Sequence, residues 1–355
     1  MPTSATLGGA KPRIGPGGWR SAWVDIGLFA AGAGLLAFLI CRIGAAPIAE
    51  ALASLGLALP LIVGVEAFAV LANTLSWRCT IAPEHRGDVP FTRLVAARIV
   101  GDAANYVITA GVGEISKVRL LARYLPMEPA LTSVALAKIT EGIALGLFGI
   151  LGLLVAWPIL AVSTVSGVTI AIAVLVGVGL VTGGLVAARI GVMTIGVRLF
   201  RRLVATQVDH MRLVGPAMPA EAEMRALQQG LLGSTVWHLV GWLVNVGELW
   251  VACHVLGLRP SWGVVFGGEA LGVLFDAAFF FVPMRIGAAE GGRMFVFRLL
   301  GFGAAAGLAL GLVRRIRELA WAVAGLVIYA WLARGDRRVP GRGEGQDRRG
   351  SVATA

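Results

Sequence analysis

Long apolar stretches alternate with short polar stretches along most of the chain. An apolar stretch of about 20 residues is long enough to cross a bilayer as a helix. On this basis we expect crossings at 22–41, 58–77 and 231–255, two more within the uncharged stretch 142–188, and a last helix over 304–333. Trp157-Pro158 is the expected turn within the uncharged stretch, and 46–56 is expected to be an amphipathic helix at the membrane surface. The pattern therefore predicts an all-α, polytopic membrane helix bundle of about six crossings.

Two apolar segments do not fit a simple crossing. Residues 94–113 contain Arg98, Asp102 and Asn105, and basic residues stand on both sides of the segment. Residues 262–283 follow the same pattern in the second half of the chain. Basic residues on both sides of an apolar segment indicate that it enters and leaves the membrane at one face. We therefore predict two re-entrant segments.

The order of charged residues in the first half returns in the second half. The corresponding pairs are Glu66 and Glu248, Asp102 and Asp276, Glu114 and Glu290, Lys117 and Arg293, Lys138 and Arg315, and Glu141 and Glu318. A repeated charge pattern within an apolar chain is typical of transporters whose binding site lies between two repeats. An odd number of expected crossings separates the copies, which predicts an internal repeat of inverted orientation.

The composition supports a membrane protein and changes the interpretation of the net charge. The chain of 355 residues is 57% hydrophobic and 14% charged, and its mean hydropathy is +0.81. Soluble domains carry about 25% charged residues. The net charge of +11 comes mainly from Lys and Arg in short loops beside apolar segments, where they orient a protein in the membrane. We therefore expect no nucleic-acid partner.

The distribution of Lys and Arg also predicts the arrangement of the chain. Both termini and the central linker are expected on the cytoplasmic side, with Trp77-Arg78 as an anchor at the membrane surface. The inversion places Arg285, Arg293 and Arg298 toward the outer side, against this rule. The expected regions are a disordered basic tail at 1–20, a first membrane half at 21–188 (repeat 1 about 58–156), a linker at 189–230, a second membrane half at 231–333 (repeat 2), and a disordered tail at 334–355.

Short motifs resemble one family. Gly113-Glu114 followed by basic residues, and Gly287-x-x-Glu290-Gly291-Gly292, are similar to motifs of the flippase-like membrane domain found in lysylphosphatidylglycerol synthases and in many stand-alone bacterial proteins. The ending Leu312-Val313-Arg314-Arg315-Ile316-Arg317-Glu318 is most similar to the branch associated with hopanoid biosynthesis. The resemblance covers about residues 20–333. It implies a polytopic helical domain that moves or handles lipids in the bacterial cytoplasmic membrane.

Where the family often has a proline in the first copy, this chain has Thr109-Ala110-Gly111-Val112, so the turn there must rely on glycine. The second copy keeps Pro283. We expect no soluble aminoacyl-transferase domain after the last helix, and hence no synthesis of an aminoacyl lipid by this chain alone.

The charged residues in apolar segments are the candidate site, because each ionised group at the bilayer centre costs at least ~2.5–3.5 kcal/mol without a partner or water. The predicted substrate-binding residues are Glu114, Lys117, Arg119, Lys138, Arg285, Glu290, Arg293 and Arg315. The predicted coupling or structural acids are Glu66, Asp102, Glu141, Glu248, Asp276 and Glu318. No motif has metal-ligand spacing, so we expect neither a metal nor a cofactor.

A purely structural interpretation of the same residues is also open. Lys138 and Glu141, like Arg315 and Glu318, stand three positions apart and pair locally on a helix. Glu114 and Glu290 would then pair with Lys138 and Arg315 and hold the fold.

Three functions follow from these observations. Translocation or handling of a polar, anionic or hopanoid-type lipid between the leaflets, through a polar cleft between the two repeats, is the function that we expect. A non-transporting membrane protein could instead dock lipid-biosynthesis proteins through the basic linker 189–225. An acid/base enzyme using Glu114 and Glu290 is the third, although no motif supplies an electrophile. The sequence does not specify an oligomeric state.

Overall fold

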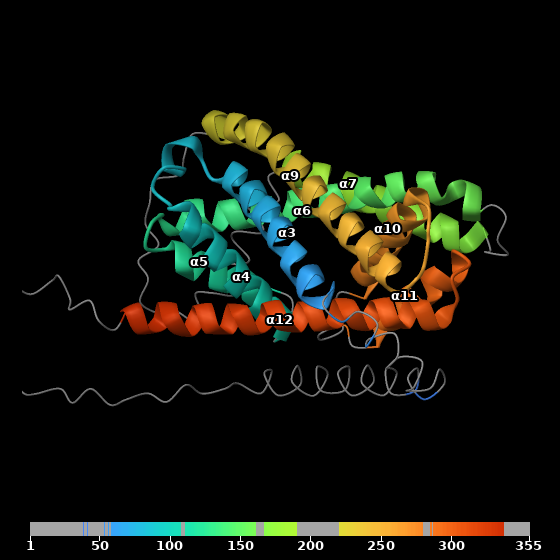
Figure 1. Ribbon diagram of the computed structural model, residues 1–355. Helices are drawn as coiled ribbons and strands as arrows, with labels where there is room; N and C mark the ends of the chain where they lie inside the picture. Colours follow the sequence, from blue (N-terminus) through green and yellow to red (C-terminus); the bar gives the residue numbers. More distant parts are fainter. Residues whose placement is uncertain are drawn as a thin grey trace, which may run out of the picture.

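The computed structural model describes residues 58–107, 111–160, 167–189, 220–279, 285 and 287–336, with isolated positions at 38, 41, 53 and 56. Regular structure in these ranges is helical throughout (Figure 1), so the predicted all-α class is confirmed. The expected crossing at 22–41, the amphipathic helix at 46–56, both tails up to 20 and from 337, and residues 190–219 of the linker lie outside the described ranges.

The helices follow the predicted apolar segments with some shifted boundaries. They are α3 (Ala58–Thr80), η1 (Pro83–His85, a 3₁₀ turn), α4 (Phe91–Val107), α5 (Val112–Leu121), α6 (Met127–Leu160), α7 (Gly167–Arg189), α9 (Ala220–Val255), α10 (Trp262–Ala278), α11 (Ala288–Leu299) and α12 (Ala304–Asp336). α9 begins at Ala220, within the range expected for the linker. The predicted turn at Trp157-Pro158 is wrong, because α6 continues to Leu160. A proline so near a helix end removes only one backbone hydrogen bond, so the helix continues past Pro158.

Three of the described helices, α3, α6 and α9, are long and apolar enough to cross a membrane. Their outer faces expose large apolar side chains such as Phe68, Leu154 and Leu243. Exposed apolar surface of this extent suits contact with lipid tails. The further crossings that would make six remain a prediction.

α3 and α9 lie side by side and run in opposite directions (Figure 1). Gly230, near the start of the apolar part of α9, packs against Cys79 near the end of α3. Further along, the Ser234 Oγ lies 2.7 Å from the Ser76 Oγ, and His238 Nδ1 lies 2.8 Å from Asn73 Oδ1. Polar side chains that hydrogen-bond across helices are typical of membrane bundles.

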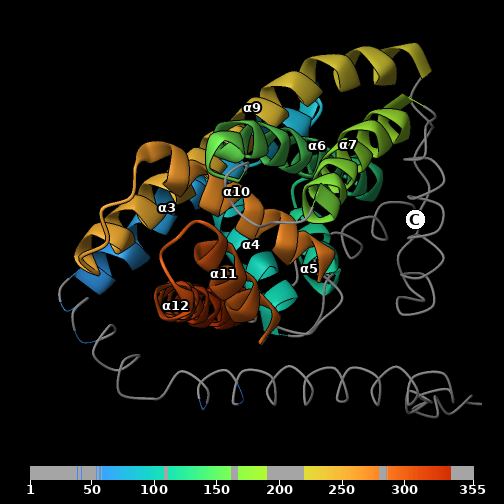
Figure 2. The same cartoon turned by 90° about the vertical axis from the view of Figure 1, so that its right-hand side faces the viewer.

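α6 and α12 flank the bundle on opposite sides and run in opposite directions (Figures 1 and 2). Each packs against a helix from the other half of the chain, α6 against α10 and α12 against α4. A Cβ added at Gly152 would collide with Ala270, and one added at Gly325 would collide with Ala103. The backbones approach so closely because small residues stand at both crossings.

Each predicted re-entrant segment belongs to a pair of packed helices, α4 with α5 and α10 with α11. The residue before α5 is Gly111 with φ 103°, and the residue before α11 is Gly287 with φ 76°. Positive φ favours glycine, which explains how the chain turns in the first copy without a proline. The re-entrant course and the inversion of the two copies remain predictions.

Candidate functional site

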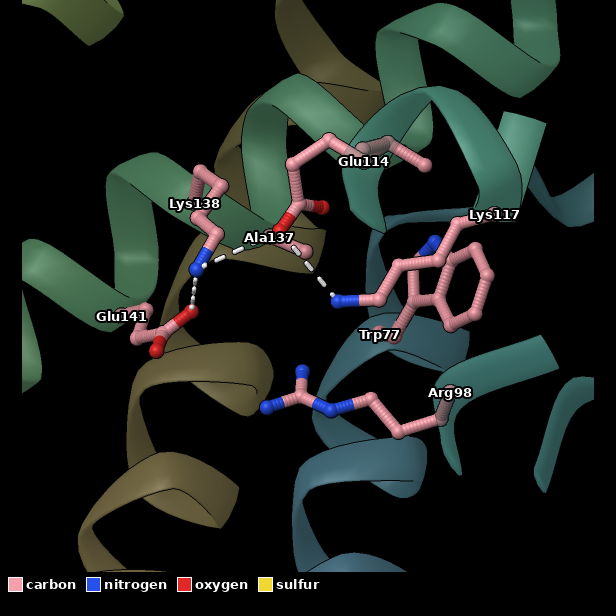
Figure 3. A pocket seen from close by; sticks show the side chains of 8 residues that line it. Trp77, Arg98, Glu114, Lys117, Ala137, Lys138 and Glu141 are labelled. Atoms are coloured by element: carbon pink, nitrogen blue, oxygen red, sulfur yellow. Dashed lines mark hydrogen bonds and ion pairs between the residues drawn. The ribbon is translucent and has the colours of Figure 1, made fainter. Parts of the chain in front are cut away.

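A first charged cluster lies where α4, α5 and α6 meet, with α3 behind it (Figure 3). It consists of Arg98, Asp102, Glu114, Lys117, Lys138 and Glu141. Most of these side chains, together with Trp77 of α3, surround a cavity of about 10 Å³. This is room for about one water molecule. In this arrangement the charges satisfy one another and leave no space for a lipid headgroup.

Glu114 is the centre of the first charged cluster. Its Oε1 accepts hydrogen bonds from the Asn105 Nδ2 at 2.9 Å and the Lys117 Nζ at 3.3 Å. The Lys138 Nζ lies 3.4 Å from the same oxygen. Glu114 also stands in the first turn of α5, where the helix dipole stabilises a negative charge. One carboxylate therefore joins α4, α5 and α6.

Asn105, which the sequence analysis did not count among the site residues, fixes the start of α5. Its Oδ1 accepts hydrogen bonds from the backbone N–H of Gly111 at 3.0 Å and of Gly113 at 2.8 Å. Its amide group therefore holds the end of α4 to the start of α5 while it also donates to Glu114. The signal in the sequence was its position, about one helical turn after Asp102.

Lys117 and Arg98 both bind Asp102. The Lys117 Nζ lies 2.9 Å from the Asp102 Oδ1, and the Arg98 Nε lies 2.6 Å from the Asp102 Oδ2. Arg98 was missing from the predicted site, although its i,i+4 spacing from Asp102 is typical of a helical ion pair.

The first charged cluster is open on one side. The Lys138 side chain is 45% exposed and the Asp102 side chain 41%, whereas the Lys117 side chain is 3% exposed. Arg119 is exposed and does not line the cavity, because residues two positions apart face different sides of a helix. Lys138 is therefore the cation that a group from outside meets first.

A second charged cluster joins α10, α11 and α12. It consists of Glu269, Asp276, Arg285, Glu290, Arg293, Arg314, Arg315 and Glu318. Glu290 is completely buried. Its Oε1 lies 2.6 Å from the Arg315 Nε, and its Oε2 accepts a hydrogen bond of 2.7 Å from the Gly287 N–H at the start of α11.

Glu269 lies on the inner side of the second charged cluster. It lies 3.3 Å from Arg293 and 2.6 Å from Arg314. The Arg285 guanidinium lies 3.9 Å from Asp276 and 3.7 Å from Glu318. Glu269 and Arg314 were not among the predicted site residues, because neither has a counterpart in the charge order of the first copy.

The two clusters repeat the same contacts. Glu114 with Lys138 corresponds to Glu290 with Arg315, Lys138 with Glu141 to Arg315 with Glu318, and Lys117 with Asp102 to Arg293 with Asp276. The order of charges in the sequence is therefore matched by equivalent ion pairs in space. The first two of these correspondences are also the pairs that the purely structural interpretation expects.

Tyr106 connects the two halves. The Arg315 Nη1 donates a hydrogen bond of 2.7 Å to the Tyr106 hydroxyl oxygen, and the guanidinium carbon lies 5.7 Å from the centre of the ring. Tyr106 stands on α4 and Arg315 on α12, so no local pattern in the sequence could show the contact.

Glu66 and Glu248, equivalent positions of the two copies, meet at one arginine. The Glu66 Oε2 lies 2.9 Å from the Arg317 Nη1, and the Glu248 Oε2 is paired with the same nitrogen. The sequence analysis counted both acids among the candidate residues but not the arginine between them.

The Trp77 side chain is not exposed, as the predicted anchor at the membrane surface would require. It is 1% exposed, and its Nε1 donates a hydrogen bond of 3.2 Å to the Ser133 Oγ. Packing of α6 over the end of α3 buries the ring and makes it a wall of the cavity.

The model of one protein family, the lysylphosphatidylglycerol synthase TM region, matches residues 23–326. The chain belongs to this family. It is therefore a membrane protein, as the composition and the apolar helices predict. Neither a curated protein nor a solved structure matches the chain. Membership of the hopanoid-associated branch remains a prediction.

In this member of the lysylphosphatidylglycerol synthase TM family, the described residues include no group of His, Cys, Asp and Glu arranged to hold a metal ion. The chemistry that the described clusters offer is ion pairing. Ammonium and guanidinium groups that can exchange one carboxylate for another can also take the phosphate of a lipid headgroup.

Proposed function

We propose that this member of the lysylphosphatidylglycerol synthase TM family moves a polar or anionic lipid, or a hopanoid-type lipid, between the leaflets of the membrane. The observation that carries the proposal is the presence of two equivalent sets of ion pairs between apolar helices. Charges at this depth are expensive to keep, and in membrane proteins they generally mark a path for a polar substrate.

The open side of the first charged cluster is where we propose that a headgroup enters. Lys138 is partly exposed and already shared between Glu114 and Glu141. A phosphate can replace one of these carboxylates without leaving a bare charge. The cavity holds about one water molecule, so the ion pairs must separate before a headgroup fits. In the proposed cycle, the described arrangement would be the closed state.

The second charged cluster would take the headgroup from the other side of the membrane. The opposite directions of α3 and α9, and of α6 and α12, support an inverted duplication (Figure 1). Inverted repeats allow a site to open first to one face and then to the other. The first turns of α5 and α11, each with a glutamate, would favour an anion once that carboxylate moves away.

We propose the bacterial cytoplasmic membrane as the location, with both termini and the basic linker on the cytoplasmic side. The two membrane halves at 21–188 and 231–333 would then form the two sides of the path. Transport rather than catalysis is the proposed activity, and membrane lipids are its substrates.

The proposal is tested by lipid flipping in liposomes reconstituted with the purified protein. The probes are phosphatidylglycerol and phosphatidylcholine that carry a dithionite-quenchable fluorophore, together with a labelled hopanoid. Wild type should accelerate the crossing of at least one of these lipids. Glu114→Gln and Glu290→Gln should each abolish the acceleration, while Glu84→Gln, a change of an exposed residue outside both clusters, should not.

Two variants on α5, each of which removes one positive charge, distinguish a role of the cluster from a general effect of charge. Lys117→Gln should slow flipping because Lys117 lies in the cluster, whereas Arg119→Gln tests the exposed cation two positions away. If wild type moves none of the lipids, the transport proposal fails. If all the variants flip lipid as fast as wild type, the clusters hold the fold and the path lies elsewhere.

A further inference from the structure

A third group of charges forms ion pairs of its own beside the second charged cluster, where α3, α9 and α12 meet. Glu66 comes from α3, Glu248 from α9 and Arg317 from α12. Both carboxylates contact the same nitrogen, Arg317 Nη1, and the Glu66 contact is 2.9 Å long. We refer to these residues as the carboxylate pair with Arg317.

The charges of this group do not balance. In the described part of the chain, the first cluster combines Arg98, Lys117 and Lys138 with Asp102, Glu114 and Glu141. The second combines Arg285, Arg293, Arg314 and Arg315 with Glu269, Asp276, Glu290 and Glu318. Each of these sets has as many acids as bases, whereas Glu66 and Glu248 share one guanidinium.

The charged neighbours of the carboxylate pair are already engaged. Arg314 is bound to Glu269 at 2.6 Å and lies 3.5 Å from Glu318. Asp102, the next acid on α4, is held by Arg98 and Lys117. No second base among the described residues is therefore left for the carboxylate pair.

The lack of a second cation for Glu66 and Glu248 is costly because the group is buried. The side chains of Arg317, Glu248 and Glu66 are 5%, 8% and 21% exposed. Among the described residues, the buried Glu66 Oε2 and Arg317 Nε have no hydrogen-bond partner. Two carboxylates that share one cation with little solvent cannot both stay ionised cheaply, which favours a proton on one of them.

We propose that the carboxylate pair with Arg317 binds one exchangeable proton and that this proton couples lipid movement to the proton gradient, an inference that rests on the proposed lipid transport. The bond formed and broken is the O–H bond of one glutamate, and the proton passes to or from water. Loss of the proton leaves two carboxylates in repulsion across the contact between α3 and α9. That contact is where the equivalent helices of the two copies meet, so their separation would open the bundle on one side.

The proton itself is detected by infrared difference spectroscopy on the purified full-length protein, which needs no transport. Wild type should show the C=O band of one protonated carboxylic acid, lost in Glu66→Gln and in Glu248→Gln because the remaining acid is neutralised by Arg317. Glu114→Gln, a change in a balanced cluster, should keep the band. If the band is absent from wild type, or is unchanged in both variants of the carboxylate pair, the proton site is overturned.

Coupling is measured in liposomes with a pH difference across the membrane. If one proton moves with each lipid, one pH unit should shift the leaflet distribution of the lipid up to about tenfold. In Glu66→Gln and Glu248→Gln this shift should disappear. A distribution that follows a sodium gradient, or no gradient, overturns the coupling. If wild type moves no lipid, the transport proposal fails, while the infrared band still decides the proton site.

Discussion

The first and second charged clusters contain equivalent ion pairs but differ in how deeply their side chains are buried in the protein. Glu114 is 14% exposed and shares one oxygen among Lys117, Lys138 and Asn105, and Lys138 is 45% exposed. Glu290 is completely buried and uses its two oxygens for Arg315 and for the Gly287 N–H. Around Glu114 the first cluster thus uses two flexible lysines, of which Lys138 lies at an open edge, whereas Glu290 in the second cluster pairs with a planar arginine within the bundle.

This difference indicates different roles for the two copies in the described state. A lysine ammonium can turn from one carboxylate to another, whereas a guanidinium keeps a fixed geometry with its partners. Under the proposed function, the first cluster is suited to exchange a carboxylate for a headgroup, and the second is suited to hold the bundle closed.

The largest loss of stability is expected when an ion pair of the second charged cluster is removed. Glu290→Gln leaves Arg315 without its main partner in a buried site, which typically costs about 3–5 kcal/mol. Glu114→Gln should cost less, about 1–3 kcal/mol, because the lysines around it keep other acids. Thermal unfolding of both variants in detergent measures the difference. Equal destabilisation would mean that the two clusters support the fold equally.

Two glycines, one beside each charged cluster, test how tightly the helices around the clusters are packed. A Cβ at Gly101 would collide with the Lys117 side chain and the Gly113 carbonyl oxygen, whereas one at Gly272 would lie 3.5 Å from the Arg293 Nη1, an ordinary contact. Gly101→Ala should therefore destabilise the protein by about 1–3 kcal/mol, as overpacking does.

Gly272→Ala is the matched control and should leave the unfolding temperature close to that of wild type. Loss of stability in Gly272→Ala but not in Gly101→Ala would show that the helices around the first cluster can move apart without cost.

The smallest loss of stability is expected when the hydrogen bond between Tyr106 and Arg315, which joins the two halves, is removed. Tyr106→Phe removes the hydroxyl that accepts the hydrogen bond from Arg315 and keeps the ring beneath the guanidinium. The expected cost is about 1 kcal/mol, read from the unfolding temperature. The double variant Tyr106→Phe with Glu290→Gln should cost less than the sum of the single changes, because both act on Arg315. Additive costs would show that Tyr106 and Glu290 act independently.

The sequence predicted much of the fold and most of the acids of the two charged clusters for a clear reason. Apolar length predicts membrane helices, and α3, α6 and α9 follow that rule. The repeated order of charges identified Glu114, Glu290, Lys138 and Arg315, and the structure pairs them within each copy.

The residues missed by the sequence analysis depend on contacts between distant segments. Tyr106 belongs to the site through Arg315, 209 positions away. Arg317 matters because α3 and α9 bring two acids to it. Trp77 was misplaced because a tryptophan near the end of an apolar helix is typical of the membrane surface, and only the packing of α6 shows that it is buried.

The long helices α6 and α12 each pack against a short helix of the other half of the chain, and this packing bears on how the chain evolved. α6 packs against α10, and α12 packs against α4 as well as α11, so each half helps to cover a short helix of the other half. A half-length polypeptide made alone would expose these faces, and two halves made as separate polypeptides should reassemble. On the predicted inversion of the two copies, an ancestor that consisted of one copy would have needed a second copy of itself, inserted in the opposite orientation, as its folding partner.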